Sequence, residues 1–212
     1  MTEPTFGPAF RDQLDKLLAW RRDVRHFQTR ALPEGLLDTL IEAACRGPSV
    51  GNAQPWRFVR ILSPERREAL AVQVDGHKHA AGEQYSGERK ALYDGLKLHG
   101  LREAPEIVAV FCDEQGEAGQ GLGRVTMPET LCWSVVTAVH TVWLAARANG
   151  VGLGWVSIID PHSINALLDV PEHWRFIALL CLGYPERETD TPELVRHGWQ
   201  DRLPPATTRL ER

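Results

Sequence analysis

The fold is decided by the stretch LCWSVVTAVHTVWLAARA at residues 131–148, which is the longest apolar run in the chain. Its apolar side chains recur at helical spacing, at Leu131, Val135, Ala138, Val142 and Ala145. Serine, threonine, histidine and arginine interrupt the run and make it too polar for a membrane span. We therefore expect one long helix at the centre of a hydrophobic core.

The residues around this helix predict where it begins and ends. Thr126 and Glu129 have the spacing of a capping box, in which two side chains satisfy free backbone N–H groups at a helix start. Asn149 and Gly150 are typical of a helix end, because both tolerate a left-handed backbone conformation.

Shorter elements surround the long helix. Apolar spacing predicts helices at 14–20, 36–44, 64–74 and 88–102, strands at 56–62, 107–112, 153–159 and 176–183, and a short helix opened by Asp160 and Pro161. The polar segment Asp75–Gly87 is a surface loop or a mobile lid, and the tail from Tyr184 is proline-rich and irregular. Strands and helices alternate loosely and no segment repeats, so we predict a single α+β domain over residues 1–212.

The composition is that of an ordinary globular protein. Of 212 residues, 43% are hydrophobic and 25% are charged, and the net charge of -4 argues against nucleic acid or an anionic membrane as a partner. The first ten residues have neither a basic start nor an apolar run, so we expect no secretory signal and a cytoplasmic protein. The cysteines are far apart in sequence, and three of them lie in apolar stretches, so they are expected to be reduced, buried thiols: Cys45, Cys112, Cys132 and Cys181.

Three arginines and one acid gather directly after the first predicted helix. Arg21, Arg22 and Arg25 present planar forks that suit phosphate oxygens, and the single carboxylate of Asp23 cannot neutralise all three. The segment is therefore either a phosphate clamp that contains an acid or a basic helix end in solvent. Because the net charge of the chain is negative, a small phosphate suits this local cluster better than a polymer does.

Several familiar active-site patterns are absent from the sequence. The glycines at 119, 121 and 123 lack the G-x-G-x-x-G spacing of a dinucleotide loop, and Ser49 is not part of a G-x-S-x-G turn. His77 and His79 lack further ligands at useful spacing, so we expect no metal site.

A polar loop at Pro48–Trp56 joins a predicted helix to a predicted strand. Its serine, asparagine and glutamine side chains can address the polar edge of a planar heterocycle, although the same residues also form ordinary turns. Trp56 and the later Trp155 are either core aromatics or residues that stack on a cofactor.

Together these segments resemble the FMN-dependent nitroreductase superfamily, whose members have an R-R-S-x-R opening, a P-S-x-x-N-x-Q-P-W loop and a late arginine, here Arg202. Asp23 replaces the serine of that opening. With this change the chain is similar to the 5,6-dimethylbenzimidazole synthase (BluB) family over about residues 14–205. The motifs are R-R-D-V-R at 21–25, S-G-E-R at 86–89, L-K-L-x-G at 96–100, G-L-G-R-x-T-M-P-E at 121–129, W-L-A-A-R-A at 143–148, G-W-V-S-I at 154–158 and P-E-L-x-x-x-G-W at 192–199.

The resemblance implies a nitroreductase-like α+β fold, with a mixed central sheet packed against helices. It also implies a homodimer that holds FMN at the subunit interface. The residues that match the family's flavin contacts are Arg21, Arg22, Asp23, Val24, Arg25, Ser49, Gln54, Arg89, Ser157 and Arg202. Among them, the arginines of the opening would clamp the phosphate and ribityl region.

The activity that the resemblance implies consumes its own flavin. Reduced FMN reacts with dioxygen, the ring system is fragmented, and a ribityl carbon enters 5,6-dimethylbenzimidazole, the lower ligand of cobalamin. We expect the arginines to hold Asp23 ionised with a lowered pKa, and Asp23 to accept protons from the ribityl chain. Ser157 would help to orient the oxygen adduct. The alternatives are a helix-end salt bridge for Asp23 and a satisfied strand hydroxyl for Ser157.

Two other functions fit the same residues. An NAD(P)H:FMN oxidoreductase of the superfamily would recycle the flavin, whereas a flavin carrier would bind FMN and yield no new compound in air. For a synthase, we expect NAD(P)H to act only indirectly, through a separate flavin reductase that supplies reduced FMN.

Overall fold

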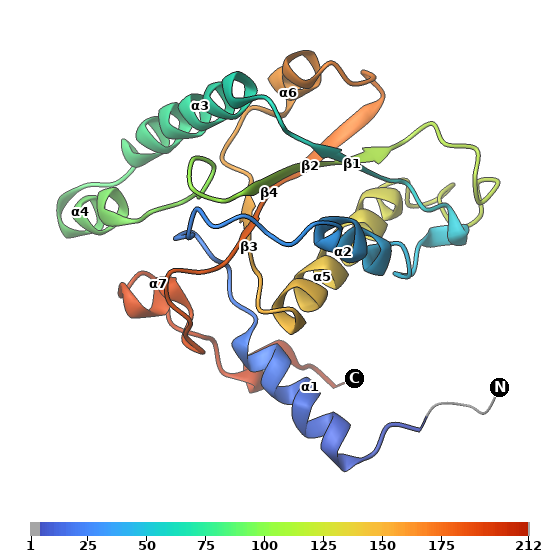
Figure 1. The fold of residues 1–212 in the computed structure, drawn as a ribbon, viewed down its shortest axis with the longest axis horizontal. Coiled ribbons are helices and arrows are strands. Elements are labelled where there is room, and N and C mark those ends of the chain that lie inside the picture. The colour runs from blue at the N-terminus through green and yellow to red at the C-terminus, as the bar shows by residue number, and fades with distance from the viewer. Residues whose placement is uncertain (1–4, 212) are drawn as a thin grey trace.

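Four strands form the central sheet of the computed structural model, which describes residues 5–211 (Figure 1). They are β1 (Trp56–Arg60), β2 (Glu106–Asp113), β3 (Gly152–Val156) and β4 (Trp174–Gly183), in the order β1-β2-β4-β3. Each overlaps a strand predicted from the sequence, but β3 ends before Ser157, which the prediction had placed inside the strand.

The expectation of a mixed sheet is wrong for these strands. β2 pairs antiparallel with both β1 and β4, and β3 pairs antiparallel with the other edge of β4. Within residues 5–211, the one parallel contact is an isolated bridge between Asp23 and Leu153. Strands that are buried on both faces are continuous apolar runs, and such runs carry no signal of strand direction.

Helices cover both faces of the sheet (Figure 1). Their bounds are α2 (Leu36–Ala44), α3 (Pro64–Gly82), α5 (Thr130–Ala148) and α6 (Pro161–Leu168). α2 and α5 pack on the face of β2 that presents Val108 and Val110. α3 and α6 pack on the opposite face, which presents Ile107 and Ala109. The alternation of side chains along β2 therefore contributes to two apolar clusters.

α5 is the central helix that the apolar run predicts. Its buried residues are Leu131, Ser134, Val135, Ala138, Val139, Val142 and Ala146. By length and composition the helix could cross a membrane, but 44% of its apolar window is buried inside the structure. The packing of α5 against α2 and the sheet explains its apolar composition without a bilayer.

The start of α5 differs from the predicted capping box. Glu129 occupies the N-cap position with helical backbone angles, and its side chain caps no backbone N–H. Thr130 instead donates its hydroxyl to the carbonyl oxygen of Met127 at 2.6 Å, which closes a turn before the helix. The predicted end is confirmed, because Asn149 caps the helix through its backbone N–H and Gly150 has a φ of +70°.

α3 and α4 differ from the predicted helices on either side of the polar segment. α3 continues to Gly82, so most of the predicted loop or lid at Asp75–Gly87 is helical. No proline interrupts this segment, and its alanines favour a helix. α4 (Gly87–Gly95) is shorter than predicted, because the chain becomes extended at Leu96.

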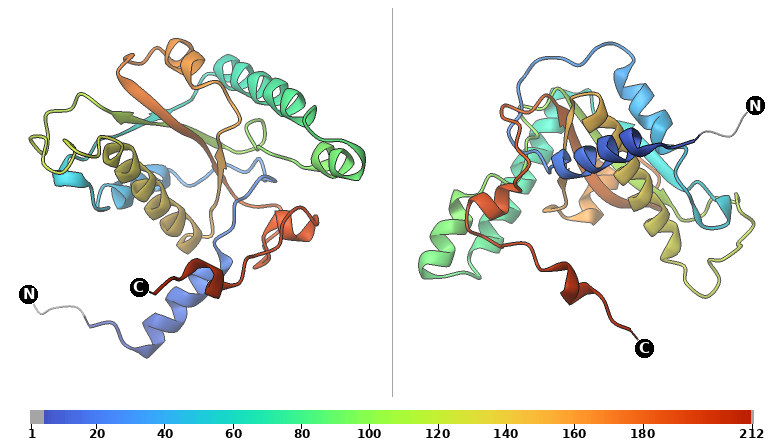
Figure 2. Two further views of the ribbon diagram at one scale, coloured as in Figure 1. Left: turned by 180° about the vertical axis from the view of Figure 1, so that it is seen from behind. Right: turned by 90° about the horizontal axis from the view of Figure 1, so that it is seen from below.

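The two terminal segments lie away from the sheet (Figures 1 and 2). α1 (Pro8–Trp20) has no buried residue and exposes the apolar side chains of Phe10, Leu14 and Leu18. The segment after β4 is largely irregular, as predicted, and contains α7 (Glu193–Arg196) and the 3-10 turn η2 (Pro205–Thr208). Apolar surface of this extent on α1 is typical of an interface.

Candidate functional site

Asp23 is placed by a close contact between the segment after α1 and strand β3. The backbone N–H of Val24 donates to the carbonyl oxygen of Leu153 at 3.0 Å. Gly154 permits this approach, because a Cβ atom there would lie 2.1 Å from the Val24 carbonyl oxygen. The Asp23 carboxylate accepts the backbone N–H of Trp155 at 2.9 Å, which fixes the acid beside β3.

Asp23 also forms an ion pair with Arg25. One carboxylate oxygen lies 3.1 Å from both Nε and Nη2 of the guanidinium, and only 31% of the Asp23 side chain and 14% of the Arg25 side chain are exposed. Burial raises the pKa of Asp23 above its ordinary value, and the Arg25 charge and the Trp155 N–H offset only part of this effect. The predicted lowering of the pKa is therefore wrong, because the sequence shows the arginines but not the burial.

An arginine-lined groove lies beside Asp23. Its volume is about 260 Å³, and it is bounded by Arg21, Arg22, Asp23, Arg25, Pro192, Glu193, Leu194 and Arg202. The structure thus places the predicted arginines that follow α1 at the same groove as Arg202, although Arg202 lies near the other end of the sequence. The acid lies at the same groove.

The groove is positively charged, and two of its buried donors lack an acceptor among the described residues. Desolvation lowers the pKa of Arg21 and of Arg22, and repulsion from Arg202 adds to both shifts, whereas Asp23 opposes the shift of Arg21. Within the part of the chain that the structure describes, Nε of Arg22 and Nη1 of Arg25 are buried without a hydrogen-bond partner. Since buried donors without acceptors are costly, the groove is suited to an anion.

Trp143 of α5 holds two of these arginines in place. Its indole N–H donates to the carbonyl oxygen of Arg22 at 3.1 Å. The guanidinium carbon of Arg21 lies 4.8 Å from the centre of its ring, within cation–π distance. The W-L-A-A-R-A motif contained this residue, but the sequence did not predict its role, because α5 and the arginine segment meet only in the folded chain.

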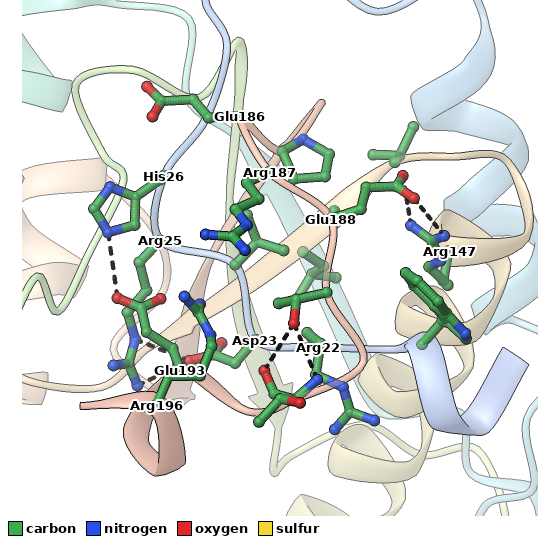
Figure 3. A pocket seen from close by; sticks show the side chains of 18 of the residues that line it. Arg22, Asp23, Arg25, His26, Arg147, Glu186, Arg187, Glu188, Glu193 and Arg196 are labelled. Carbon is green, nitrogen blue, oxygen red and sulfur yellow. Dashed lines mark hydrogen bonds and ion pairs between the residues drawn. The ribbon is translucent and has the colours of Figure 1, made fainter. Parts of the chain in front are cut away.

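A second pocket, of about 190 Å³, also borders Asp23 (Figure 3). It is lined by Val24 and by charged side chains from distant segments, among them His26, Arg147, Arg187, Glu188, Glu193 and Arg196. Glu193 is only 9% exposed and lies 3.2 Å from Nε2 of His26, and Arg147 makes a two-point ion pair with Glu188 at 2.8 and 2.9 Å. Among these residues, Val24 is predicted from the sequence as a flavin contact, but the charged ones have no predicted role, although Arg147 lies in the W-L-A-A-R-A motif and Glu193 in the P-E-L-x-x-x-G-W motif.

The other predicted residues lie outside both pockets. Ser157 is exposed just after β3, so its interpretation as a strand hydroxyl is wrong. In the loop that contains η1 (Val50–Asn52), the Ser49 hydroxyl accepts the backbone N–H of Gln54 at 3.1 Å. Gln54 has a φ of +48°, and its side chain donates to the Asn52 carbonyl oxygen. Within one chain this loop does not line the arginine groove.

Arg89 contacts the tail instead of the groove. Its guanidinium carbon lies 3.6 Å from the centre of the Trp199 ring, and Nη1 donates to the Trp199 carbonyl oxygen at 3.0 Å. Tyr85 and Tyr93 complete an aromatic cluster around the same tryptophan. Arg89 therefore joins α4 to the segment that leads to Arg202.

A model of the nitroreductase family matches residues 18–184. The chain belongs to the nitroreductase family. Among curated relatives, it is 52% identical to the 5,6-dimethylbenzimidazole synthase of Rhodospirillum rubrum, with 96% of each chain covered. It is 47% identical to the 5,6-dimethylbenzimidazole synthase of Rhodobacter capsulatus, over 94% of this chain and 96% of that protein. The resemblance seen in the motifs is confirmed, and within the nitroreductase family the chain groups with these synthases.

Solved structures of nitroreductase-like proteins share the fold. Oxidized iodotyrosine deiodinase bound to FMN and 3-iodo-L-tyrosine is 26% identical and aligns with a TM-score of 0.68 over 83% of this chain and 91% of that chain. A nitroreductase family protein of Streptococcus pneumoniae aligns with a TM-score of 0.67 over 94% of this chain and 100% of that chain, at 19% identity. The predicted nitroreductase-like α+β fold is therefore confirmed.

Proposed function

We propose that this chain is a 5,6-dimethylbenzimidazole synthase that consumes reduced FMN and dioxygen. Similarity to two curated synthases over nearly the whole chain supports the activity. The single structural observation that supports it best is Asp23, a largely buried carboxylate held by the Trp155 N–H at an arginine-lined groove. The acid stands where the nitroreductase pattern has a serine.

The residues of the groove fit the phosphate of FMN. Arg22 and Arg25 have buried N–H groups without acceptors among the described residues, and Arg21 and Arg202 add two further positive charges. A phosphate carries several acceptor oxygens and a negative charge, so it satisfies these donors and relieves the repulsion among the guanidiniums. We therefore assign the phosphate and ribityl end of FMN to Arg21, Arg22, Arg25 and Arg202.

Asp23 is the proposed base. Reduced FMN supplies the electrons that reduce dioxygen and the carbon skeleton of the product. The ionised Asp23 carboxylate accepts a proton from the ribityl chain, and the Trp155 N–H and Arg25 hold it in one orientation before the transfer. Because burial raises the pKa of Asp23, this carboxylate binds a proton more readily than an exposed one does.

Ser157 is the second proposed catalytic residue. It is exposed at the end of β3, the strand that also presents the Trp155 N–H to Asp23. A free hydroxyl at this place can donate a hydrogen bond to bound oxygen species without giving up a partner within the strand. Replacement by alanine should therefore lower the yield of product more than it lowers the affinity for FMN.

A second copy of the chain is proposed to complete the site. The second pocket, about 190 Å³, is smaller than the roughly 300 Å³ at which ligand pockets begin, and the Ser49–Gln54 loop lines neither pocket. Exposed Trp133 and Val136 on α5, together with the apolar side chains of α1, offer a surface for the second copy. In such a homodimer, Ser49 and Gln54 of one chain would face the flavin held by the other.

Sedimentation of the purified protein tests this arrangement. A dimer is expected at the concentrations at which FMN binds, and Trp133→Glu should weaken the dimer and FMN binding together. A stable monomer that binds FMN with full affinity would contradict the shared site.

The fate of the flavin tests the activity. The protein is mixed with chemically reduced FMN, exposed to air, and the products are separated by chromatography. We expect 5,6-dimethylbenzimidazole, and we expect NAD(P)H to support its formation only when a flavin reductase is added. Quantitative return of FMN would contradict the proposal, and rapid NAD(P)H oxidation with intact FMN would identify an oxidoreductase instead.

A further inference from the structure

The S-G-E-R motif at 86–89 meets the P-E-L-x-x-x-G-W motif at 192–199 in the folded chain. Arg89 ends the first motif and Trp199 ends the second, and the guanidinium carbon of Arg89 lies 3.6 Å from the centre of the Trp199 ring. Nη1 of Arg89 also donates to the Trp199 carbonyl oxygen at 3.0 Å. One arginine of α4 therefore holds both the side chain and the backbone of this tail residue, and the proposed flavin chemistry gives the contact no role.

Two tyrosines fix the aromatic cluster around Trp199 to the body of the protein. The Tyr85 ring meets the Trp199 ring edge-on, with the two centres 5.4 Å apart, and the centre of the Tyr93 ring lies 5.9 Å from that of Trp199. Tyr93 is only 7% exposed and packs against Gly82 at the end of α3, where a Cβ atom would lie 3.3 Å from its ring. Aromatic pairs at such distances attract each other. Trp199 is therefore held by residues of α4 and of the link between α3 and α4.

The backbone of Trp199 is joined to the wall of the arginine groove by one tight turn. Its N–H donates to the Leu194 carbonyl oxygen at 2.8 Å, and the N–H of Gly198 donates to the Val195 carbonyl oxygen at 3.0 Å. This pair of bonds is the Schellman motif that ends a helix, here α7. Gly198 has the positive φ that the motif needs, +66°. Because Leu194 lines the groove, the contacts that hold Trp199 also hold this wall.

Arg202 follows Trp199 by three residues and lines the same groove. Its charge repels those of Arg21 and Arg22 there. Like charges at one groove tend to move apart, so the position of Arg202 must be stabilised by another part of the fold. Residues 200–204 belong to no helix or strand. The nearest fixed point along the chain is therefore Trp199, which Arg89 and the tyrosines hold.

We propose that Arg89 and Trp199 are positioning residues, which hold Arg202 at the groove and thereby set the preference of the site for FMN over riboflavin. The inference rests on the proposed assignment of the flavin phosphate to this groove. Riboflavin has the ring system and the ribityl chain of FMN but lacks the phosphate, so only FMN gains from the charge of Arg202. Since the tail is already fixed before the ligand arrives, FMN does not lose affinity by having to order it.

Titration of the full-length protein with oxidised FMN and with riboflavin tests the proposal. The preference for FMN is the dissociation constant of riboflavin divided by that of FMN. Arg89→Leu should weaken FMN binding about 2–5-fold, the size of one exposed cation–π contact, and should leave riboflavin binding unchanged. Trp199→Leu should lower the same preference. Arg66→Leu, which removes an exposed arginine of α3, is the matched control and should bind both flavins as the wild type does.

Combination with Arg202→Ala separates positioning from direct contact. In the Arg202→Ala background, Arg89→Leu should cause no further loss of FMN affinity, because both residues act through one interaction. Additive losses, or equal losses for FMN and riboflavin, would make Arg89 a direct flavin contact and overturn the proposal. Arg89 is exposed, so its variant decides the matter even if Trp199→Leu does not fold.

The same titrations distinguish this proposal from the ones on which it rests. A preference for FMN that Arg202→Ala lowers and Arg89→Leu does not would overturn the positioning role and leave the phosphate assignment standing. An unchanged preference in Arg202→Ala would contradict both. Neither result depends on whether the protein consumes FMN, because only binding is measured.

Discussion

Replacing Asp23 with asparagine removes the proposed base but keeps the size and shape of the side chain. In the wild type, Asp23 accepts the Trp155 N–H at 2.9 Å. Asparagine keeps the shape of the side chain and an oxygen that can accept this N–H, but it removes the negative charge opposite Arg25. A positioned general base contributes about 10²–10⁴-fold in rate, so we expect product formation to fall by that factor. FMN affinity should be retained or rise, because the substitution removes a negative charge from a groove that is proposed to bind an anion.

The same variant should also change how stability depends on pH. The folded protein protonates Asp23 at a higher pH than the unfolded chain, whose carboxyl has the ordinary pKa of 3.8. Relative to Asp23→Asn, the wild type therefore gains stability as the pH falls toward 3.8 and loses it as the pH rises through the folded pKa. Catalysis needs the ionised form, so activity should fall on acidification, with a midpoint above 3.8.

Three measurements distinguish these effects. Single-turnover reactions with reduced FMN and air give the yield and rate of product, fluorescence titration gives the FMN dissociation constant, and urea unfolding at several pH values gives the stability. Asp38→Asn, an exposed carboxylate on α2, is the matched control and should behave as the wild type. A wild-type rate in Asp23→Asn, or a loss of FMN affinity as large as the loss of rate, would refute the assignment of Asp23 as the base.

Other substitutions test the groove and its supports. Arg202→Ala should weaken FMN binding about 10–100-fold, the loss expected for a charged hydrogen bond of about 1.5–3 kcal/mol, and an unchanged dissociation constant would remove Arg202 from the site. Gly154→Ala should destabilise the fold by about 1–3 kcal/mol in urea unfolding, because its Cβ would meet the Val24 carbonyl oxygen at 2.1 Å; wild-type stability would show that this approach is not tight. Ser134→Ala should cost about 1–3 kcal/mol in thermal unfolding, because the Val50 N–H loses its acceptor, and an unchanged midpoint would show that water replaces the hydroxyl.

The anion-binding character of residues 21–25 was predictable from the sequence, because the three arginines are close together in the chain and a guanidinium group suits phosphate oxygens. In the structure, Arg21, Arg22, Arg25 and Arg202 line one groove. The raised pKa of Asp23 was not predictable, because it depends on burial against β3, which no short motif encodes. The roles of Ser157, Gln54 and the other predicted flavin contacts stay predictions.

Element positions followed from apolar spacing, whereas their pairing did not. The central helix and all four strands were located from runs of apolar residues. The antiparallel order β1-β2-β4-β3 depends on the paths of the long connections between the strands, and local apolar spacing does not predict those paths. The polar residues of Asp75–Gly87 suggested a loop, but no proline breaks the segment and its alanines favour a helix, so α3 continues to Gly82.

The most direct test of the proposed synthase activity is to measure how much FMN is lost and how much 5,6-dimethylbenzimidazole is formed. In the same air-exposed samples of protein and reduced FMN, chromatography quantifies FMN and 5,6-dimethylbenzimidazole together. A synthase should lose one FMN for each molecule of product, with both changes absent in Asp23→Asn. Full recovery of FMN without product, under conditions in which the wild type binds it, would show that the flavin is borrowed and not consumed.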